Sequence, residues 1–184
     1  MRARDFFSRW RVRLGYLLAV VVLLLARPNP CSILLGAAVG AIGLAIRAYS
    51  AGYLHKQEVL TTTGPYACTR NPLYFGSSIL AVGAAVAMRS WLAAAVILLY
   101  FAVVYAFVMR REEMELRGKH GAAFDAYAAA VPLFFPWLPR KSPPGEAYGA
   151  FSWAHYKRNH EYEAPVGFLL FLILLVLIWR WRAL

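Results

Sequence analysis

Charged residues are scarce in this chain. Of its 184 residues, 16% are charged and 61% are apolar, whereas soluble globular proteins carry about 25% charged residues. This composition excludes a disordered tail and argues against a water-soluble domain. Acidic residues are the scarcer kind, since 9 Asp and Glu against 20 Lys and Arg give a formal net charge of +11. Such a basic excess is typical of proteins that bind nucleic acid and of membrane proteins. The position of the charges relative to the apolar runs distinguishes these two interpretations.

Cysteine is scarce as well, with Cys31 and Cys68 as the two examples. Two cysteines exclude a secreted disulfide scaffold, and Cys and His nowhere recur at the spacing of a metal site. We therefore expect no metal ion. We also expect no disulfide, because the topology predicted below places the two cysteines on opposite sides of a membrane.

Long apolar runs fill most of the sequence instead. They cover residues 14–26, 31–46, 73–88, 91–109 and 166–179. A membrane-spanning helix needs about 20 apolar residues, or about 17 at the short end. We expect an all-α, polytopic integral membrane protein with about five transmembrane helices and additional amphipathic helices at the interface. The first run resembles a signal peptide but is followed by no cleavage site, so we expect an uncleaved anchor, and the last run either spans the bilayer or is re-entrant.

Basic residues gather on one side of this predicted topology. If the runs alternate across the bilayer, the N-terminus, the loop 55–72 and the segment 110–165 share a side, and together they hold 15 of the 20 Lys and Arg residues. Lys and Arg mark the cytoplasmic side. We therefore place the N-terminus and both polar segments in the cytoplasm, at the cytoplasmic membrane. The basic excess is expected to orient the protein and to attract anionic lipid rather than nucleic acid.

Turn residues divide these segments into further elements. Residues 89–90 alone separate two apolar runs, which predicts a tight antiparallel helical hairpin. Its second helix is expected to leave the membrane and to end at Gly118 or Gly121. Apolar residues at helical spacing predict an amphipathic helix over 124–131. Beyond a proline-rich stretch, Ser152 is expected to cap a short helix.

The first polar segment offers a site for an anion. Asn71 and Pro72 predict the start of a helix, with proline at the first helical position. Arg70 and Asn71 then lie beside the free N–H groups of that helix end, where an anion is favoured and the arginine adds a bidentate fork. The alternative is a snorkelling arginine next to a plain Asx cap.

The second polar segment offers carboxylates. Glu112 and Glu113 emerge where a helix leaves the bilayer, and ionisable residues there are costly unless they pair or serve a ligand. The alternative is a local network of i, i+4 ion pairs, Glu113 with Arg117 and Glu115 with Lys119. That network leaves Glu112 without a local partner, a role open to Arg70 or to a cationic ligand.

The two segments together carry a resemblance. The stretch GPYACTRNPLYFG, followed after one helical hairpin by EEMELRGKHGAAFDAYAAAVPLFFP, resembles the isoprenylcysteine carboxyl methyltransferase and phospholipid methyltransferase group of integral membrane enzymes. Asn71 stands where many members carry His, and an amide cannot act as an acid or base. We expect one membrane-embedded domain over 1–184, with a family core at 55–136, an interfacial linker and short helix at 137–164, and a C-terminal helix at 165–184.

The resemblance implies S-adenosylmethionine as methyl donor, bound in a cytosol-facing pocket, and a lipid-like acceptor such as a prenylcysteine-type carboxylate or a phospholipid amine. The catalytic residues that it implies are Arg70 and Glu112. The cofactor-binding residues that it implies are Tyr66, Arg70, Asn71, Tyr74, Gly76, Glu112 and Glu113. The candidates for acceptor binding are Trp153, Tyr156 and Asn159, with aromatic anchoring at the interface as the alternative.

Two other functions compete with methyl transfer. Membrane reductases of the sterol reductase type, which use NADPH, resemble the same module but are much longer. A non-enzymatic scaffold or small transporter predicts charges within the spans, and Arg47 is the one candidate for such a charge. The sequence leaves the oligomeric state open.

Overall fold

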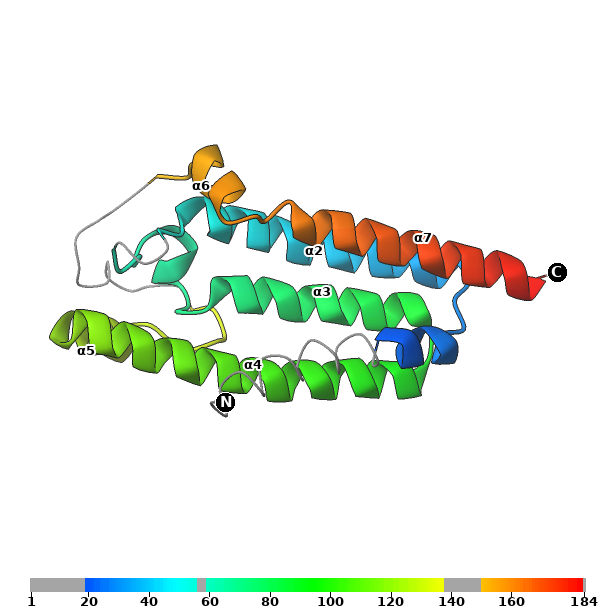
Figure 1. Ribbon diagram of the computed structural model, residues 1–184, viewed down its shortest axis with the longest axis horizontal. Helices are drawn as coiled ribbons and strands as arrows, with labels where there is room; N and C mark the ends of the chain where they lie inside the picture. The colour runs from blue at the N-terminus through cyan, green and yellow to red at the C-terminus, as the bar shows by residue number, and fades with distance from the viewer. Residues whose placement is uncertain (1–18, 56–58, 138–149, 184) are drawn as a thin grey trace, which may run out of the picture.

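Four long helices run side by side along the length of the computed structural model (Figure 1), which describes residues 19–55, 59–137 and 150–183. They are α2 (Pro30–Tyr53), α3 (Pro72–Met88), α4 (Trp91–His120) and α7 (Glu163–Ala183). Shorter helices lie at one end of the molecule: the 3-10 helix η1 (Gly64–Ala67), α5 (Ala122–Ala130) and α6 (Trp153–Arg158). The described residues contain no β-strand, which confirms the all-α class for them.

Three of these helices, α2, α4 and α7, are long and apolar enough to cross a membrane. Many of their large apolar side chains are exposed, as expected where lipid replaces water, with Leu34 71%, Leu99 68% and Leu169 59% exposed. The sequence predicted about five spans. Helix α3 has 17 residues and falls at the short end of the required length, and the first predicted run, 14–26, lies partly outside the described residues, which show a helix over 19–25.

Helices α2 and α3 approach closely because glycines face each other along the contact. A Cβ atom at Gly83 would lie 2.6 Å from the backbone nitrogen of Gly40, and one at Gly36 would lie 2.5 Å from the Cβ of Ala87. Helices in membranes commonly pack through such small residues. The pair Gly36 and Gly40 therefore serves packing within the chain.

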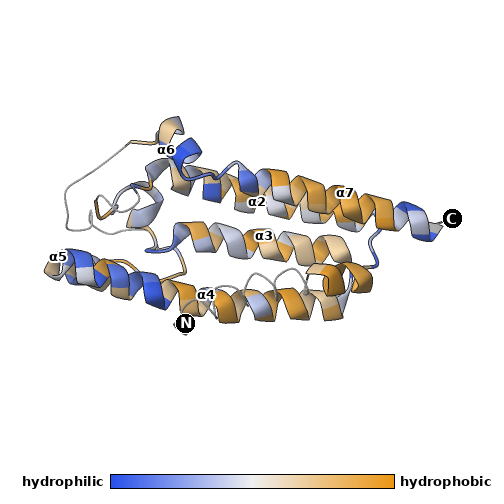
Figure 2. Cartoon of the chain, in the orientation of Figure 1, coloured by the Kyte–Doolittle hydropathy of each residue, from blue (hydrophilic) through white to orange (hydrophobic). Residues whose placement is uncertain are grey.

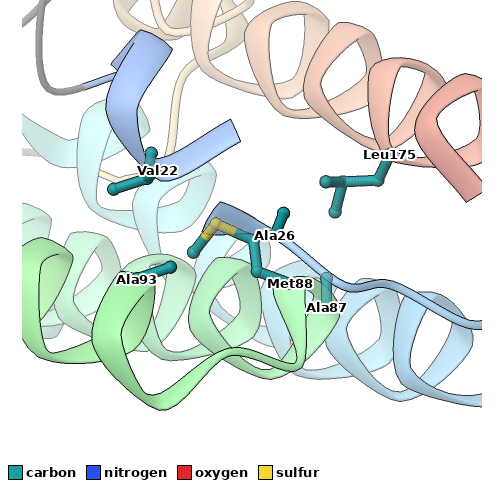
Figure 3. Close-up of a cluster of buried hydrophobic side chains, with 6 residues drawn as sticks. All are labelled: Val22, Ala26, Ala87, Met88, Ala93 and Leu175. Carbon is teal, nitrogen blue, oxygen red and sulfur yellow. The ribbon is translucent and has the colours of Figure 1, made fainter. Parts of the chain in front are cut away.

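A tight turn joins α3 to α4, as predicted. Arg89 adopts a left-handed conformation with φ 48°, and the Ser90 side chain accepts a hydrogen bond from Ala93 N at 3.4 Å. Apolar side chains from four parts of the chain meet beside this turn (Figure 3), namely Val22, Ala26, Ala87, Met88, Ala93 and Leu175. This cluster closes the end of the molecule opposite to η1, α5 and α6.

Helix α4 continues beyond its apolar part. Its residues are mainly hydrophobic in the part beside α3 and mainly hydrophilic toward α5 (Figure 2). Its 30 residues correspond to about 45 Å, against a hydrocarbon core of about 30 Å. The helix ends at His120 with Gly121 as its C-cap, and α5 buries Phe124 and Tyr127, so both predicted elements are confirmed.

The C-terminal elements also follow the sequence closely. The Ser152 side chain caps α6 by accepting a hydrogen bond from Ala154 N at 3.2 Å. The last apolar run forms one continuous helix, α7, that is long enough to span. Of the linker predicted over 137–164, residues 138–149 lie outside the described residues.

Candidate active site

A cavity of about 440 Å³ lies at the polar end of the molecule, between the end of α2, η1, the polar end of α4 and α5. Small-molecule sites commonly measure about 300–1,000 Å³. Five of the predicted site residues line it: Tyr66, Arg70, Asn71, Glu112 and Glu113. Segments that are far apart in the sequence therefore meet around one space, as the resemblance implied.

Arg70 connects three of the surrounding segments. Its Nη2 atom lies 2.9 Å from the Glu113 carboxylate on α4, and its Nη1 atom donates to Ala128 O on α5 at 3.0 Å. Its backbone N–H donates to Pro132 O at 2.9 Å. The Nε atom is buried without a hydrogen-bond partner among the described residues. Arg70 thus keeps donor capacity at the cavity wall after its structural contacts are made.

Glu112 has different surroundings from its neighbour. Its carboxylate is exposed and accepts a hydrogen bond from the Tyr74 hydroxyl at 2.5 Å. The Tyr74 ring lies edge-on to Tyr105, with 5.0 Å between ring centroids. Tyr74 is not among the residues that line the cavity, so the structure places it behind Glu112 as a hydrogen-bond donor.

Asn71 precedes α3, as expected, but its side chain does not cap that helix. The amide donates instead to Leu133 O at 2.9 Å, and the neighbouring Thr69 hydroxyl is 3.0 Å from Phe134 O. These bonds hold the 131–137 segment against the start of α3. The alternative of a plain Asx cap is wrong, because the amide has a distant carbonyl to bond.

Two tyrosines belong to the buried part of the wall. The Tyr127 hydroxyl donates to Tyr66 O at 2.7 Å, while the Tyr66 hydroxyl is buried with no hydrogen-bond partner among the described residues. Burial raises the pKa of both phenols above the ordinary value for tyrosine, and the proximity of the ionisable Tyr127 adds to the effect at Tyr66. Both hydroxyls therefore remain neutral donors at physiological pH.

Besides Tyr74, four predicted site residues lie elsewhere than on the cavity wall. Gly76 faces α2, where a Cβ atom would lie 2.8 Å from Arg47 Cγ and 2.9 Å from Gly43 O. Trp153 and Tyr156 lie on α6 with ring centroids 5.6 Å apart, and the Asn159 amide donates to carbonyls at the end of α2. Cofactor or acceptor contact by these residues stays a prediction.

Neither of the two example ion pairs forms among the described residues, although α4 does carry one i, i+4 pair. Glu115 pairs with Arg111 at 2.9 Å on the same helix, whereas Glu113 pairs with Arg70 across the fold and Arg117 pairs with Asp125 at 2.7 Å. The spacing rule considers only partners on one helix, so it could not identify Arg70 or Asp125, which lie on the two polar segments beside the end of α4. Arg70 was also a candidate partner for Glu112, but the structure pairs Arg70 with Glu113 instead.

Sequence reasoning missed several residues of the wall. They include His55, Leu60, Lys119, His120, Phe124 and Tyr127. The helical spacing of Phe124 and Tyr127 identified them as buried, but it gave no sign of what they face. The charged lining residues are three carboxylates, Glu112, Glu113 and Glu115, against Arg70 and Lys119, so with neutral histidines they sum to −1.

Within 19–55, 59–137 and 150–183, no three His, Cys, Asp or Glu side chains gather in a way that suits a metal ion. Cys31 and Cys68 are both free thiols.

Comparison with known proteins gives two curated relatives. The nickel-cobalt-cadmium resistance protein NccN of Alcaligenes xylosoxydans xylosoxydans is 36% identical over 107 residues, 57% of this chain and 48% of that protein. The cobalt-zinc-cadmium resistance protein CzcN of Cupriavidus metallidurans is 31% identical over 142 residues, 73% of this chain and 65% of that protein. The chain thus spans about half to two thirds of these relatives.

No solved structure matches the chain. The family described as phospholipid methyltransferase matches residues 32–123, which contain nearly all of α2, the whole of α3 and α4, and most of the cavity wall. The match confirms the resemblance to the isoprenylcysteine carboxyl methyltransferase-like group. With half of its residues inside the match, this chain belongs to the phospholipid methyltransferase family.

Proposed function

We propose that the chain is an integral membrane methyltransferase that uses S-adenosylmethionine and methylates a lipid-like acceptor. The observation that carries the proposal is the cavity at the polar end of the helices, where Arg70, Glu112 and Glu113 meet in a member of the phospholipid methyltransferase family. We also propose that the polar end of the helices faces the cytoplasm, because the segments that connect the helices there are rich in Lys and Arg.

The residues present suit such a donor. The Arg70 guanidinium has a buried Nε donor to offer a carboxylate, and the buried Tyr66 hydroxyl has no protein partner. Glu112 and Glu113 suit an ammonium group or ribose hydroxyls. The lining charge of −1 favours a cationic ligand. When bound, S-adenosylmethionine supplies an electrophilic methyl group on a sulfonium.

For a carboxylate acceptor, which is already ionised, the chain's own contribution is alignment rather than proton transfer. Arg70 and Glu113 fix each other at 2.9 Å, and Tyr74 fixes Glu112 at 2.5 Å. Groups held in this way can keep donor and acceptor in register, which is the main requirement of an in-line displacement. Asn71 has no acid or base function, consistent with a site that works through orientation.

The acceptor belongs to the membrane in this proposal. A prenylcysteine-type carboxylate and a phospholipid amine both remain candidates, with Trp153, Tyr156 and Asn159 on the acceptor side. Because α3 and α4 carry exposed apolar surface, a lipid-like molecule can approach between helices while the donor arrives from the aqueous side.

A reductase that uses NADPH is the competing function. Its cofactor carries several phosphate charges, and the net negative lining of the cavity disfavours them. Fluorescence of NADPH on addition of the purified protein distinguishes the two, since the methyltransferase assignment predicts no quenching.

Both relatives are named for resistance that includes cobalt and cadmium. We propose in addition that the methylated lipid-like product of this chain contributes to the tolerance of the cell to these metals. Growth of cells that carry the wild-type chain or Glu112→Gln, with added cobalt salt, measures that contribution.

Isothermal titration of the purified full chain with S-adenosylhomocysteine tests the proposal directly. We expect saturable binding with a stoichiometry of one per chain. No binding up to about millimolar ligand, where even weak sites register, would contradict the proposed function.

A further inference from the structure

An arginine inside an apolar helix pairs with a carboxylate from the far end of the chain. Arg47 is the one charged residue of α2. Its Nε lies 2.6 Å from one carboxylate oxygen of Glu161, and its Nη2 lies 3.0 Å from the other. Its Nη1 donates to the hydroxyl of Ser77 in α3. This forked contact uses a geometry that lysine cannot reproduce.

The surroundings are shaped for this pair. The Glu161 side chain is 6% exposed and that of Arg47 is 20% exposed. Gly76 leaves the space that Arg47 occupies, because a Cβ atom there would lie 2.8 Å from Arg47 Cγ. A buried ion pair is costly unless its geometry is good and its remaining donors are used. Here the contact with the carboxylate is bidentate, and the third guanidinium nitrogen, Nη1, donates to Ser77.

The residues around Glu161 are fastened to the end of α2. The backbone N–H of Ser152 donates to Gly52 O at 3.0 Å. The Asn159 amide donates to Ala51 O at 2.8 Å and to Leu54 O at 3.2 Å. These bonds reach carbonyls at the C-terminal end of α2, where helical carbonyls run short of backbone partners; Ala51 O also accepts the Leu54 N–H at 3.3 Å. The 151–161 segment therefore sits on α2 through several independent contacts.

The same segment lies directly behind the cavity. Leu54 and His55 line the cavity. Asn159 holds the carbonyl of Leu54, and the ring of His155 packs edge-on against His55 with 4.1 Å between centroids. Glu161 is also among the charges that, after burial, raise the pKa of the wall residue Tyr66. The family match ends at residue 123, so this backing comes from outside it.

We propose that Arg47 and Glu161 form a positioning pair that holds the 151–161 segment against the cavity wall and thereby sets the affinity for the methyl donor. This inference rests on the proposed function of the cavity. Neither residue lines the cavity; each acts through the contacts of the 151–161 segment with Leu54 and His55.

The test compares two carboxylates in the full-length protein, with S-adenosylhomocysteine as the probe in isothermal titration. Glu161→Gln keeps the shape of the side chain and removes the charge that holds Arg47. We expect its dissociation constant to rise about tenfold, within the range of about 2- to 30-fold for residues that act on a site without touching the ligand. The control is Glu163→Gln, whose side chain is 71% exposed, and it should bind as the wild type does.

Titration also separates positioning from simple stability. If the pair served folding alone, Glu161→Gln would bind fewer ligands per chain with an unchanged dissociation constant, and that result would overturn the inference. Should Glu161→Gln not fold, Asn159→Leu decides, because it removes two hydrogen bonds without leaving a buried charge; we expect about threefold weaker binding. Wild-type affinity in that variant would likewise reject the inference. Failure of the wild type to bind is the separate result that rejects the proposed function.

Discussion

Glu112 and Glu113 are adjacent in sequence but occupy different environments. Glu113 lies 2.9 Å from Arg70 and is 23% exposed. Glu112 is exposed and is held by one neutral hydroxyl, that of Tyr74. Glu113 therefore contributes to the wall, whereas Glu112 keeps the charge that a cationic ligand or a ribose can use.

Replacement of Glu112 tests this distinction. Glu112→Gln should weaken S-adenosylhomocysteine binding at least about tenfold, because a hydrogen bond to a charged group contributes about 1.5–3 kcal/mol. The fold should persist because the side chain is exposed. Titration of both proteins measures the change. Asp125→Asn is the control, since this carboxylate on α5 is 57% exposed and pairs with Arg117 outside the cavity. Equal affinity of the two variants would remove Glu112 from the site.

Tyr66 and Tyr127 give the protein a defined response to alkaline pH. Burial raises the pKa of both above the ordinary value of about 10. Below about pH 10 the phenols are protonated in the folded and unfolded states alike. Above it the unfolded chain loses these protons first, so the free energy of unfolding should fall by up to about 1.4 kcal/mol per pH unit for each tyrosine.

Thermal unfolding between about pH 8 and pH 11 measures that response. The wild type should be insensitive at the lower end and should lose stability above about pH 10. Tyr127→Phe should flatten the alkaline slope relative to the wild type. An unchanged slope would show that the phenol titrates with an ordinary pKa.

At the scale of elements, the contact between α2 and α3 controls the position of the site, because the cavity lies just beyond their adjoining ends. Gly83→Ala should destabilise the protein by about 1–3 kcal/mol, the usual cost of overpacking. Its new Cβ would meet backbone atoms of Gly40 and Gly36 at 2.6 and 2.7 Å. The control is Gly167→Ala in α7, where a Cβ meets nothing within 4 Å. Thermal unfolding compares the two, and similar midpoints would contradict this packing.

Element boundaries could be predicted because their signals are local. Pro72, Ser90 and Gly121 mark helix ends through backbone geometry that one or two residues determine. Long-range partners could not be predicted in this way. The Asn71 amide bonds to Leu133 O across 62 positions, and no local rule distinguishes that from an Asx cap. Arg47 could be identified as a charge within a predicted span, but nothing in the sequence identified Glu161 as its partner.

At the scale of the whole molecule, chemistry-bearing side chains collect at one end. Tyr66, Arg70, Asn71, Glu112 and Glu113 could be assigned to a common site because two motif segments flank one hairpin. Gly76 could not be placed by that reasoning. Its position in the motif does not reveal that it faces Arg47 on another helix rather than the cavity.

The two native cysteines report the topology that this arrangement requires. Cys31 is exposed at the start of α2, and Cys68 follows η1 at the opposite end of that helix. A membrane-impermeant maleimide added to intact spheroplasts should label Cys31, whereas Cys68 should require lysed membranes. Single-cysteine variants, Cys68→Ser and Cys31→Ser, assign the signals. Labelling of both from one side would contradict the proposed orientation.

Methyl transfer itself is the most direct measurement. Purified protein should be incubated with S-adenosylmethionine labelled in its methyl group and with lipids extracted from membranes, and products identified by mass. We expect label in a lipid-soluble product with the wild type, and at least about tenfold less with Glu112→Gln, following the loss of a charge-assisted hydrogen bond. No labelled lipid with a wild-type protein that binds S-adenosylhomocysteine, or equal labelling by the variant, would contradict the central claim.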